Sequence, residues 1–140
     1  MARRRTVPPQ LRILVDTTVW RDFFTGVASE EKLSLNLLLR NRYHVVLTPT
    51  ILMELLQGTQ ADARYHQIRE YLLQIPVLPL STETHVEAAE INRRLRRMGL
   101  RLQAPQKCLA AAAAMEHDCV LLHRDTDLDC IIQHTPIRAF

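Results

Sequence analysis

The sequence has little of what marks several large protein classes. Among its 140 residues are only 3 glycines and 3 cysteines, and aromatic residues account for 5% of the chain. There is no run of about 18 apolar residues, so a membrane-spanning helix is not expected. With a hydrophobic content of 47%, the composition instead indicates a compact globule that is rich in helices.

The cysteines and the amino terminus give no sign of an exported protein. Cys108, Cys119 and Cys130 are odd in number and form no C-x-x-C motif, so neither a disulfide framework nor a zinc site is indicated. The opening segment MARRRTVPPQ lacks the apolar core of about 7 residues that a signal peptide needs. We therefore predict a cytoplasmic protein in which residues 1–10 form a flexible extension. The formal net charge of +3 permits binding to a polyanion without requiring it.

Short apolar stretches alternate with helical patterns along the whole chain. This order predicts an α/β protein of one domain, residues 1–140, folded as a three-layer α/β/α sandwich with a mainly parallel sheet. Caps, glycines and apolar spacing place the helices at 17–26, 29–41, from Thr48 or Thr50 to Gly58, and at 61–74, 83–98, 106–117 and 127–133. The expected strands are 11–15, 43–48, 75–80, 119–123 and 135–140.

Four acidic residues follow or accompany these strands. Asp16 closes LRILVD, Glu54 lies in the apolar stretch ILMELLQG, and Asp125 and Asp127 follow the strand CVLLH. Because ligands of parallel α/β sheets bind at the carboxyl ends of the strands, these acids are expected to gather there. Carboxylate oxygens are the ligands that Mg²⁺ and Mn²⁺ prefer. Taken singly, each acid has an ordinary alternative, either as a helix cap or, for Glu54, as part of an exposed helix face.

Motifs of competing enzyme classes are missing. No G-x-x-x-x-G-K-[ST] segment is present, which excludes a P-loop nucleotide hydrolase, and no G-x-S-x-G elbow is present, which excludes an ordinary α/β hydrolase. A haloacid-dehalogenase-type phosphatase would carry a second aspartate two residues after Asp16, but that position is Thr18. His123, beside the acids, is the one histidine worth testing, and a structural role is favoured for it.

In their order and spacing the acids match a known pattern. The chain resembles the PIN-domain ribonucleases, and within them the VapC toxins of bacterial toxin–antitoxin pairs, over nearly its whole length from Arg12. The most specific matches are the segments VDTTVWRDFF, ELLQG, RRMGL and LLHRDTDLDCI. The resemblance implies an endoribonuclease in which one or two Mg²⁺ or Mn²⁺ ions are bound by Asp16, Glu54, Asp125 and Asp127, with Thr18 in support. It also implies a homodimer, an RNA substrate and a small VapB-like antitoxin that blocks the cleft.

One position departs from the family pattern. Where the family has an aspartate at the start of the alanine-rich helix, this sequence reads QKCLAAAAAME and carries Lys107. A cation in a first helical turn interacts unfavourably with the helix dipole, and this costs about 0.3–1 kcal/mol of stability. Three explanations stay open: a naturally degenerate toxin, a lysine introduced to inactivate a protein that poisons its host, or a solvent-facing lysine outside the site. The first two are favoured, and both predict impaired or absent cleavage; the alternative function is a PIN-fold protein that binds RNA or an antitoxin without cutting.

Two further surfaces are predicted to bind partners. Arg93, Arg94, Arg96 and Arg97 lie on the helix expected at 83–98, and guanidinium groups suit either RNA phosphates or the acidic groups of an antitoxin. The alternative is a solvated helix face. Six leucines supply more apolar helix surface than a small sheet readily covers, which predicts a homodimer that forms through helical faces: Leu35, Leu37, Leu38, Leu39, Leu55 and Leu56.

Overall fold

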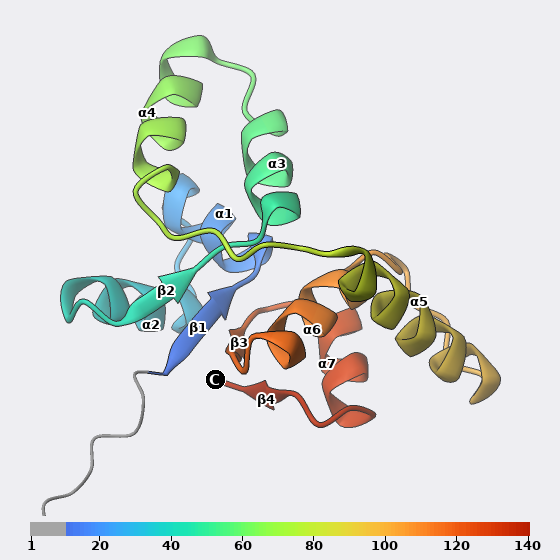
Figure 1. The fold of residues 1–140 in the computed structure, drawn as a ribbon. Helices are drawn as coiled ribbons and strands as arrows, with labels where there is room; N and C mark the ends of the chain where they lie inside the picture. The colour runs from blue at the N-terminus through green and yellow to red at the C-terminus, as the bar shows by residue number, and fades with distance from the viewer. Residues whose placement is uncertain (1–10) are drawn as a thin grey trace, which may run out of the picture.

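The computed structural model describes residues 11–140 and arranges them around a four-stranded parallel sheet with the order β2-β1-β3-β4 (Figure 1). The central strand β1 (Arg12–Val15) pairs with β2 (His44–Val46) on one side and with β3 (Val120–Leu122) on the other. The edge strand β4 (Arg138–Ala139) pairs with β3. The expected extension at residues 1–10 lies outside the described residues.

The strand predicted at 75–80 does not form. This segment contributes one isolated bridge, in which Leu47 lies opposite Val77. The amide of Leu47 donates to the Pro76 carbonyl and the amide of Leu78 donates to the Leu47 carbonyl, at 2.9 and 2.7 Å. Pro76 and Pro79 have no N–H to donate, so the ladder cannot extend.

Helices cover the sheet in two further layers. On one side, α1 (Thr17–Thr25) packs against α2 (Glu30–Arg40). On the other, α6 (Lys107–Glu116) packs between α5 (Thr82–Arg97) and α7 (Thr126–Gln133). The predicted three-layer α/β/α sandwich is therefore confirmed.

A pair of helices extends beyond these layers. Figure 1 shows α3 (Pro49–Gln57) and α4 (Asp62–Leu72) standing side by side above the sheet, with α1 at their base. None of the described helices combines the length and the apolar character needed to cross a bilayer.

Local signals set most helix boundaries. Ser29 caps α2 by accepting the amide of Lys32 at 3.0 Å, and Thr48 caps α3 by accepting the amide of Ile51 at 3.2 Å. Gly26 follows α1 with φ of 76°, the left-handed conformation that glycine adopts without strain. The start of α6 is the exception, because Gln106 provides no side-chain cap and no acid lies in its first turn.

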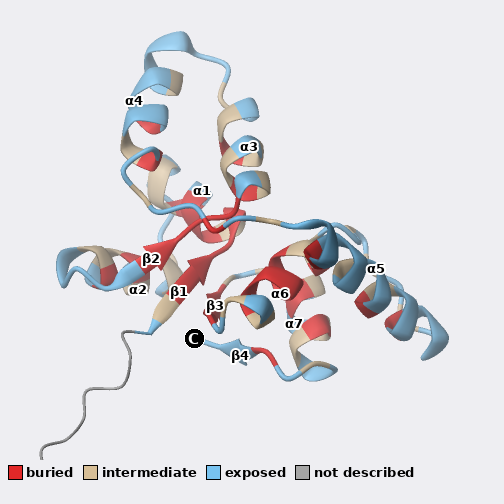
Figure 2. Cartoon of the chain, viewed as in Figure 1, coloured by how far each residue is buried: buried red, intermediate tan, exposed pale blue. Residues whose placement is uncertain are grey.

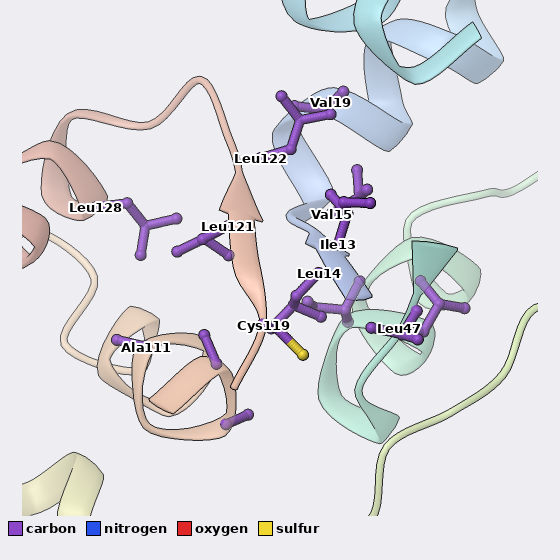
Figure 3. Close-up of a cluster of buried hydrophobic side chains, with 14 of the residues drawn as sticks. Ile13, Leu14, Val15, Val19, Leu47, Ala111, Cys119, Leu121, Leu122 and Leu128 are labelled. Carbon is purple, nitrogen blue, oxygen red and sulfur yellow. The ribbon is translucent and has the colours of Figure 1, made fainter. Parts of the chain in front are cut away.

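The core lies along both faces of the central strands (Figures 2 and 3). Figure 3 shows Ile13, Leu14 and Val15 of β1 close to Leu121 and Leu122 of β3, with apolar side chains from the flanking helices around them. Each of these five side chains is buried. Burial on both faces explains why the strands read as continuous apolar runs without alternation.

The expected surplus of exposed leucine is mostly absent. Leu35, Leu38 and Leu55 are buried in the core, and Leu39 and Leu56 pack against it while partly covered. Of the six leucines from which a homodimer was predicted, only Leu37 is largely exposed, at 59%. The argument from surplus apolar surface is therefore wrong for most of the set, because a single chain already covers these side chains.

Two leucines on one helix give a matched test of this core. Leu35→Ala removes a side chain that is 0% exposed and should lower the free energy of unfolding by about 2–5 kcal/mol. Leu37→Ala, on the exposed face of α2, should change it by less than about 0.5 kcal/mol. Urea unfolding of both variants measures the difference. The measurement is made at a concentration at which the chain is monomeric, so that Leu37 is compared in its exposed state. Equal losses would then contradict the burial assigned to Leu35.

Candidate functional site

Asp16 occupies the junction between the central strand and the first helix. It is 1% exposed and caps α1, because its carboxylate accepts the amide of Thr18 at 3.3 Å. The Thr18 hydroxyl donates to the same oxygen, Oδ2, at 2.9 Å. A buried carboxylate needs such donors, and Asp16 therefore acts both as a cap and as a negative charge held at the strand end. The Thr18 hydroxyl thus contacts the carboxylate that the family resemblance implies it supports.

Lys107 reaches this carboxylate from the first position of α6. Its Nζ lies 2.9 Å from Asp16 Oδ1 and 3.0 Å from Asp16 Oδ2, and it also donates to the Thr17 hydroxyl at 3.0 Å. The Lys107 side chain is 13% exposed. The interpretation of Lys107 as a solvent-facing lysine outside the site is thus wrong. The ammonium makes all three of its bonds next to the buried acid.

Asp125 is the second acid near the ammonium. It caps α7 by accepting the amide of Leu128 on Oδ1 at 3.0 Å, while Oδ2 lies 3.9 Å from Lys107 Nζ. That separation is an ion pair without a direct hydrogen bond. Of the two acids that follow this strand, Asp125 and not Asp127 therefore caps the helix. Lys107 contacts two carboxylates that follow neighbouring parallel strands, Asp16 after β1 and Asp125 after β3.

Asp127 holds a loop. Its two carboxylate oxygens accept the backbone amides of Gln103 and Ala104, at 3.0 and 2.7 Å. These two residues belong to the segment that leads into α6 and so to Lys107. Asp127 consequently fixes the position from which the lysine projects, and its carboxylate is already engaged by two donors.

Glu54 lines the same small cavity as Asp16 and Lys107. The cavity measures about 10 Å³, roughly the space of a single water molecule. Glu54 projects from the middle of α3, is half-buried, and forms no ion pair with any residue in the range 11–140. The structure thus brings three predicted acids around Lys107, namely Asp16, Asp125 and Glu54.

An ion pair beside the site was not identified from the sequence. Asp22 of α1 is 4% exposed, accepts the Ser29 hydroxyl at 2.9 Å, and pairs with Arg124 at 2.8 Å. The amide of Arg124 also donates to the Thr18 hydroxyl at 3.1 Å. The loop that carries Asp125 is thereby tied to α1. A carboxylate within the apolar segment WRDFF was the available signal, since a buried acid requires a partner.

The contacts of His123 and the burial of Cys108 indicate structural roles for both residues. His123 Nδ1 accepts the amide of Asp125 at 3.1 Å, which supports the turn before α7 and agrees with the structural role favoured for it. Burial raises the pKa of the Cys108 thiol to about 11, with a smaller contribution from the nearby Asp127 charge. Cys108 therefore stays protonated at neutral pH and is a poor nucleophile, although it adjoins Lys107.

The donor set does not fit a divalent cation as the chain stands. Within residues 11–140 no group of three or more histidine, cysteine or acidic side chains is arranged to hold a metal ion. Both Asp16 oxygens accept hydrogen bonds from Lys107, and the remaining cavity is too small for a hydrated ion. The Lys107 ammonium occupies the position next to the carboxylates where a hard cation would have to bind their oxygen atoms.

The arginines of α5 differ in their surroundings. Arg93 pairs with Glu90 and Arg94 with Glu87, each at 3.5 Å on the exposed face of the helix. Arg96 and Arg97 are exposed and form no ion pair within the described part of the chain. The four residues predicted as one surface thus fall into two pairs, of which only the second is free to bind an added anion.

Comparison with known proteins places this arrangement in a family. A family model described as the PIN domain matches residues 13–131. VapC ribonuclease Mb1587 of Mycobacterium bovis is 30% identical over 129 residues, which cover 91% of this chain and 96% of that protein, and ribonuclease VapC11 of Mycobacterium tuberculosis matches equally. The solved VapBC2 structure from Rickettsia felis, bound to a DNA fragment from its promoter, shares the fold with a TM-score of 0.73 at 15% identity, covering 93% of this chain and 98% of that one. The chain therefore belongs to the PIN-domain family, among the relatives of the VapC ribonucleases.

Proposed function

We propose that this chain is a cytoplasmic endoribonuclease toxin of a toxin–antitoxin pair whose Mg²⁺- or Mn²⁺-dependent cleavage is impaired by Lys107. The VapC ribonucleases that match 91% of the chain support the reaction class. One observation carries the second part, the contact of Lys107 Nζ with both oxygens of Asp16. An ammonium cannot activate water for attack on a phosphodiester, which is the chemistry that a bound divalent ion supplies.

The net charge of the four acids and Lys107 supports the proposal that cleavage is impaired. Four predicted acids and one lysine leave about three net negative charges, against about five if residue 107 were an aspartate. A divalent ion at Asp16 would have to displace the Lys107 ammonium. Asp16 is the one carboxylate among the described residues that lies within hydrogen-bonding distance of this ammonium, so the displaced group would lose its partner. The site thus has two fewer negative charges and one fewer oxygen ligand than it would have with an aspartate at 107. Each difference lowers the affinity for a divalent ion.

A second candidate is a PIN-fold protein that binds RNA or an antitoxin without cutting. The saturated hydrogen bonding of Asp16 favours it, because Lys107 and Thr18 together satisfy this carboxylate without any ion. The two candidates share a fold and differ in whether replacement of Lys107 restores cleavage.

An antitoxin is the proposed protein partner. The solved structures that share this fold include VapBC assemblies from Rickettsia felis and from nontypeable Haemophilus influenzae. By this analogy we infer a small VapB-like protein that covers the cleft above Asp16 and Lys107. RNA and antitoxin would then compete for the same side of the molecule.

The ion pair should be a strong contributor to stability. Lys107→Met leaves the Asp16 carboxylate buried without its cation and should lower the free energy of unfolding by about 3 kcal/mol. The double variant Asp16→Asn with Lys107→Met should lose less than the sum of the single losses, with a coupling of about 2 kcal/mol. Urea unfolding measures the cycle. Arg94→Met, which removes an exposed pair, is the control and should cost less than about 1 kcal/mol. Additive losses at Asp16 and Lys107 would contradict the assigned pairing.

Lys107→Asp tests the proposed reaction. It replaces the ammonium with a fifth carboxylate and should raise Mn²⁺ affinity at least about tenfold, since a charge near 4 Å contributes several kcal/mol at an effective dielectric of about 20. The variant should cleave a tRNA transcript in the presence of Mn²⁺, whereas the parent chain should show little or no cleavage. Calorimetry and gel analysis of the RNA measure the two effects.

Lys32→Asp provides the matched control for that change. Lys32 also lies in the first turn of a helix, α2, but it is not among the residues that contact Asp16 or Asp125. Its replacement should therefore leave binding and cleavage as in the parent chain. Adding Asp16→Ala to Lys107→Asp should abolish both gains. If Lys107→Asp folds and binds Mn²⁺ but cuts no RNA, the non-cleaving candidate is correct. Comparable cleavage by the parent chain would overturn the blocking role of Lys107.

The homodimer remains a prediction with a narrower basis. Exposed apolar side chains on α2 are Leu33 at 62% and Leu37 at 59%, and they replace the wider leucine set as the proposed contact. Sedimentation at micromolar concentration without antitoxin should show a dimer, and Leu33→Glu with Leu37→Glu should shift it to monomer. A parent chain that sediments only as a monomer would exclude the dimer.

A further inference from the structure

The chain leaves a small set of arginines unpaired at one end of α5. Glu90 and Glu87 neutralise Arg93 and Arg94 on the outer face of this helix. By contrast, Arg96 has no carboxylate partner within residues 11–140, and neither has Arg101, which follows the helix. Both are exposed. A guanidinium group without an ion pair can bind an added anion and break no existing contact. Arg96 and Arg101 are therefore better suited to bind a ligand than Arg93 and Arg94.

A turn after α5 brings these two arginines to one cavity. Gly99 adopts φ of 78°, and the amide of Leu100 donates to the Leu95 carbonyl at 2.9 Å, which folds the chain back at the helix end. The cavity measures about 160 Å³ and is lined by Asn92, Arg96, Arg101, Leu102 and Pro105. Asn92 and Arg96 are four residues apart and therefore share one face of the helix. Two arginines and one asparagine thus line a single cavity together with two apolar residues.

The same loop connects this cavity to the carboxylate site. Leu102 and Pro105 line the cavity, while the two residues between them, Gln103 and Ala104, donate their amides to Asp127. Lys107 begins α6 two residues after Pro105. Six residue steps separate Arg101 from Lys107, so their Cα atoms lie no more than about 21 Å apart. In Figure 1 the chain passes from the end of α5 directly to α6, with no intervening element.

We propose that Arg96 and Arg101, with Asn92, form a subsite for a backbone phosphate of RNA bound across the carboxylate site. This inference rests on the proposed function, because it takes RNA as the ligand of that site. A planar guanidinium binds phosphate oxygens in a two-pronged geometry, and two of them with an amide donor can surround one phosphate. An acidic antitoxin segment is the competing ligand. RNA is favoured because its phosphates recur along the strand, so a strand held at Asp16 carries further phosphates toward the neighbouring cavity.

The parent chain itself is suited to the test, because impaired cleavage leaves the RNA intact during titration. Binding of a fluorescein-labelled tRNA transcript is followed by anisotropy at several salt concentrations. Arg96→Gln with Arg101→Gln should weaken binding about tenfold and, because one phosphate contact is lost, reduce the slope of log affinity against log salt by about 0.7. The matched control, Arg93→Gln with Arg94→Gln, removes the same charge from the same surface and should weaken binding less than about threefold. Circular dichroism checks that both double variants fold.

Three results would overturn the subsite. Equal weakening by both double variants would show that the basic surface acts through net charge alone. Unchanged tRNA binding by Arg96→Gln with Arg101→Gln, together with weaker binding of an acidic peptide, would assign the cavity to a protein partner. Absence of tRNA binding by the parent chain, while Lys107→Asp cleaves tRNA, would place the contact elsewhere. The proposed function fails separately, through lack of cleavage by Lys107→Asp, so the two failures are distinguishable.

Discussion

The ion pair between Lys107 and Asp16 is the constraint around which the site is built. Asp16 is buried at the end of the central strand, where an uncompensated carboxylate would be strongly destabilising. In a metal-binding PIN domain an ion would supply the compensating charge, but here a side chain of the same protein does so at 2.9 Å. The fold therefore needs no ion to compensate this carboxylate.

The neighbouring contacts hold this pair in place. Asp127 binds the loop before α6, and the Arg124–Asp22 pair binds the loop before α7 to α1. Both contacts cross between segments far apart in sequence, and both use acids that a simple metal-site interpretation would count as ligands or overlook. An acid near a strand end can therefore serve as an ion-pair partner, a helix cap or a loop anchor. Asp16, Asp125 and Asp127 illustrate these different uses within one site.

The sequence predicted most of the fold because local chemistry determines it. Caps such as Ser29 and Thr48, and Gly26 at positive φ, act within a few residues and can be recognised without a structure. The failures involve distant partners. Whether Leu35 is buried while Leu37 is exposed depends on which helix face meets the sheet, and five leucines within seven residues of α2 give a weak periodic signal. The engagement of Asp127 with Gln103 and Ala104 is likewise a contact across the fold that spacing does not encode.

The same distinction explains why Lys107 was interpretable only in part. Its place in a first helical turn was unfavourable by local rules, which marked the residue as unusual. What compensates it is a buried carboxylate 91 positions earlier, together with the Thr17 hydroxyl, and neither lies near it in sequence. A locally unfavourable residue with strong distant partners is expected at a functional or strained site rather than on an open surface. That expectation depends only on the contacts of Lys107 and not on which of the two proposed functions is correct.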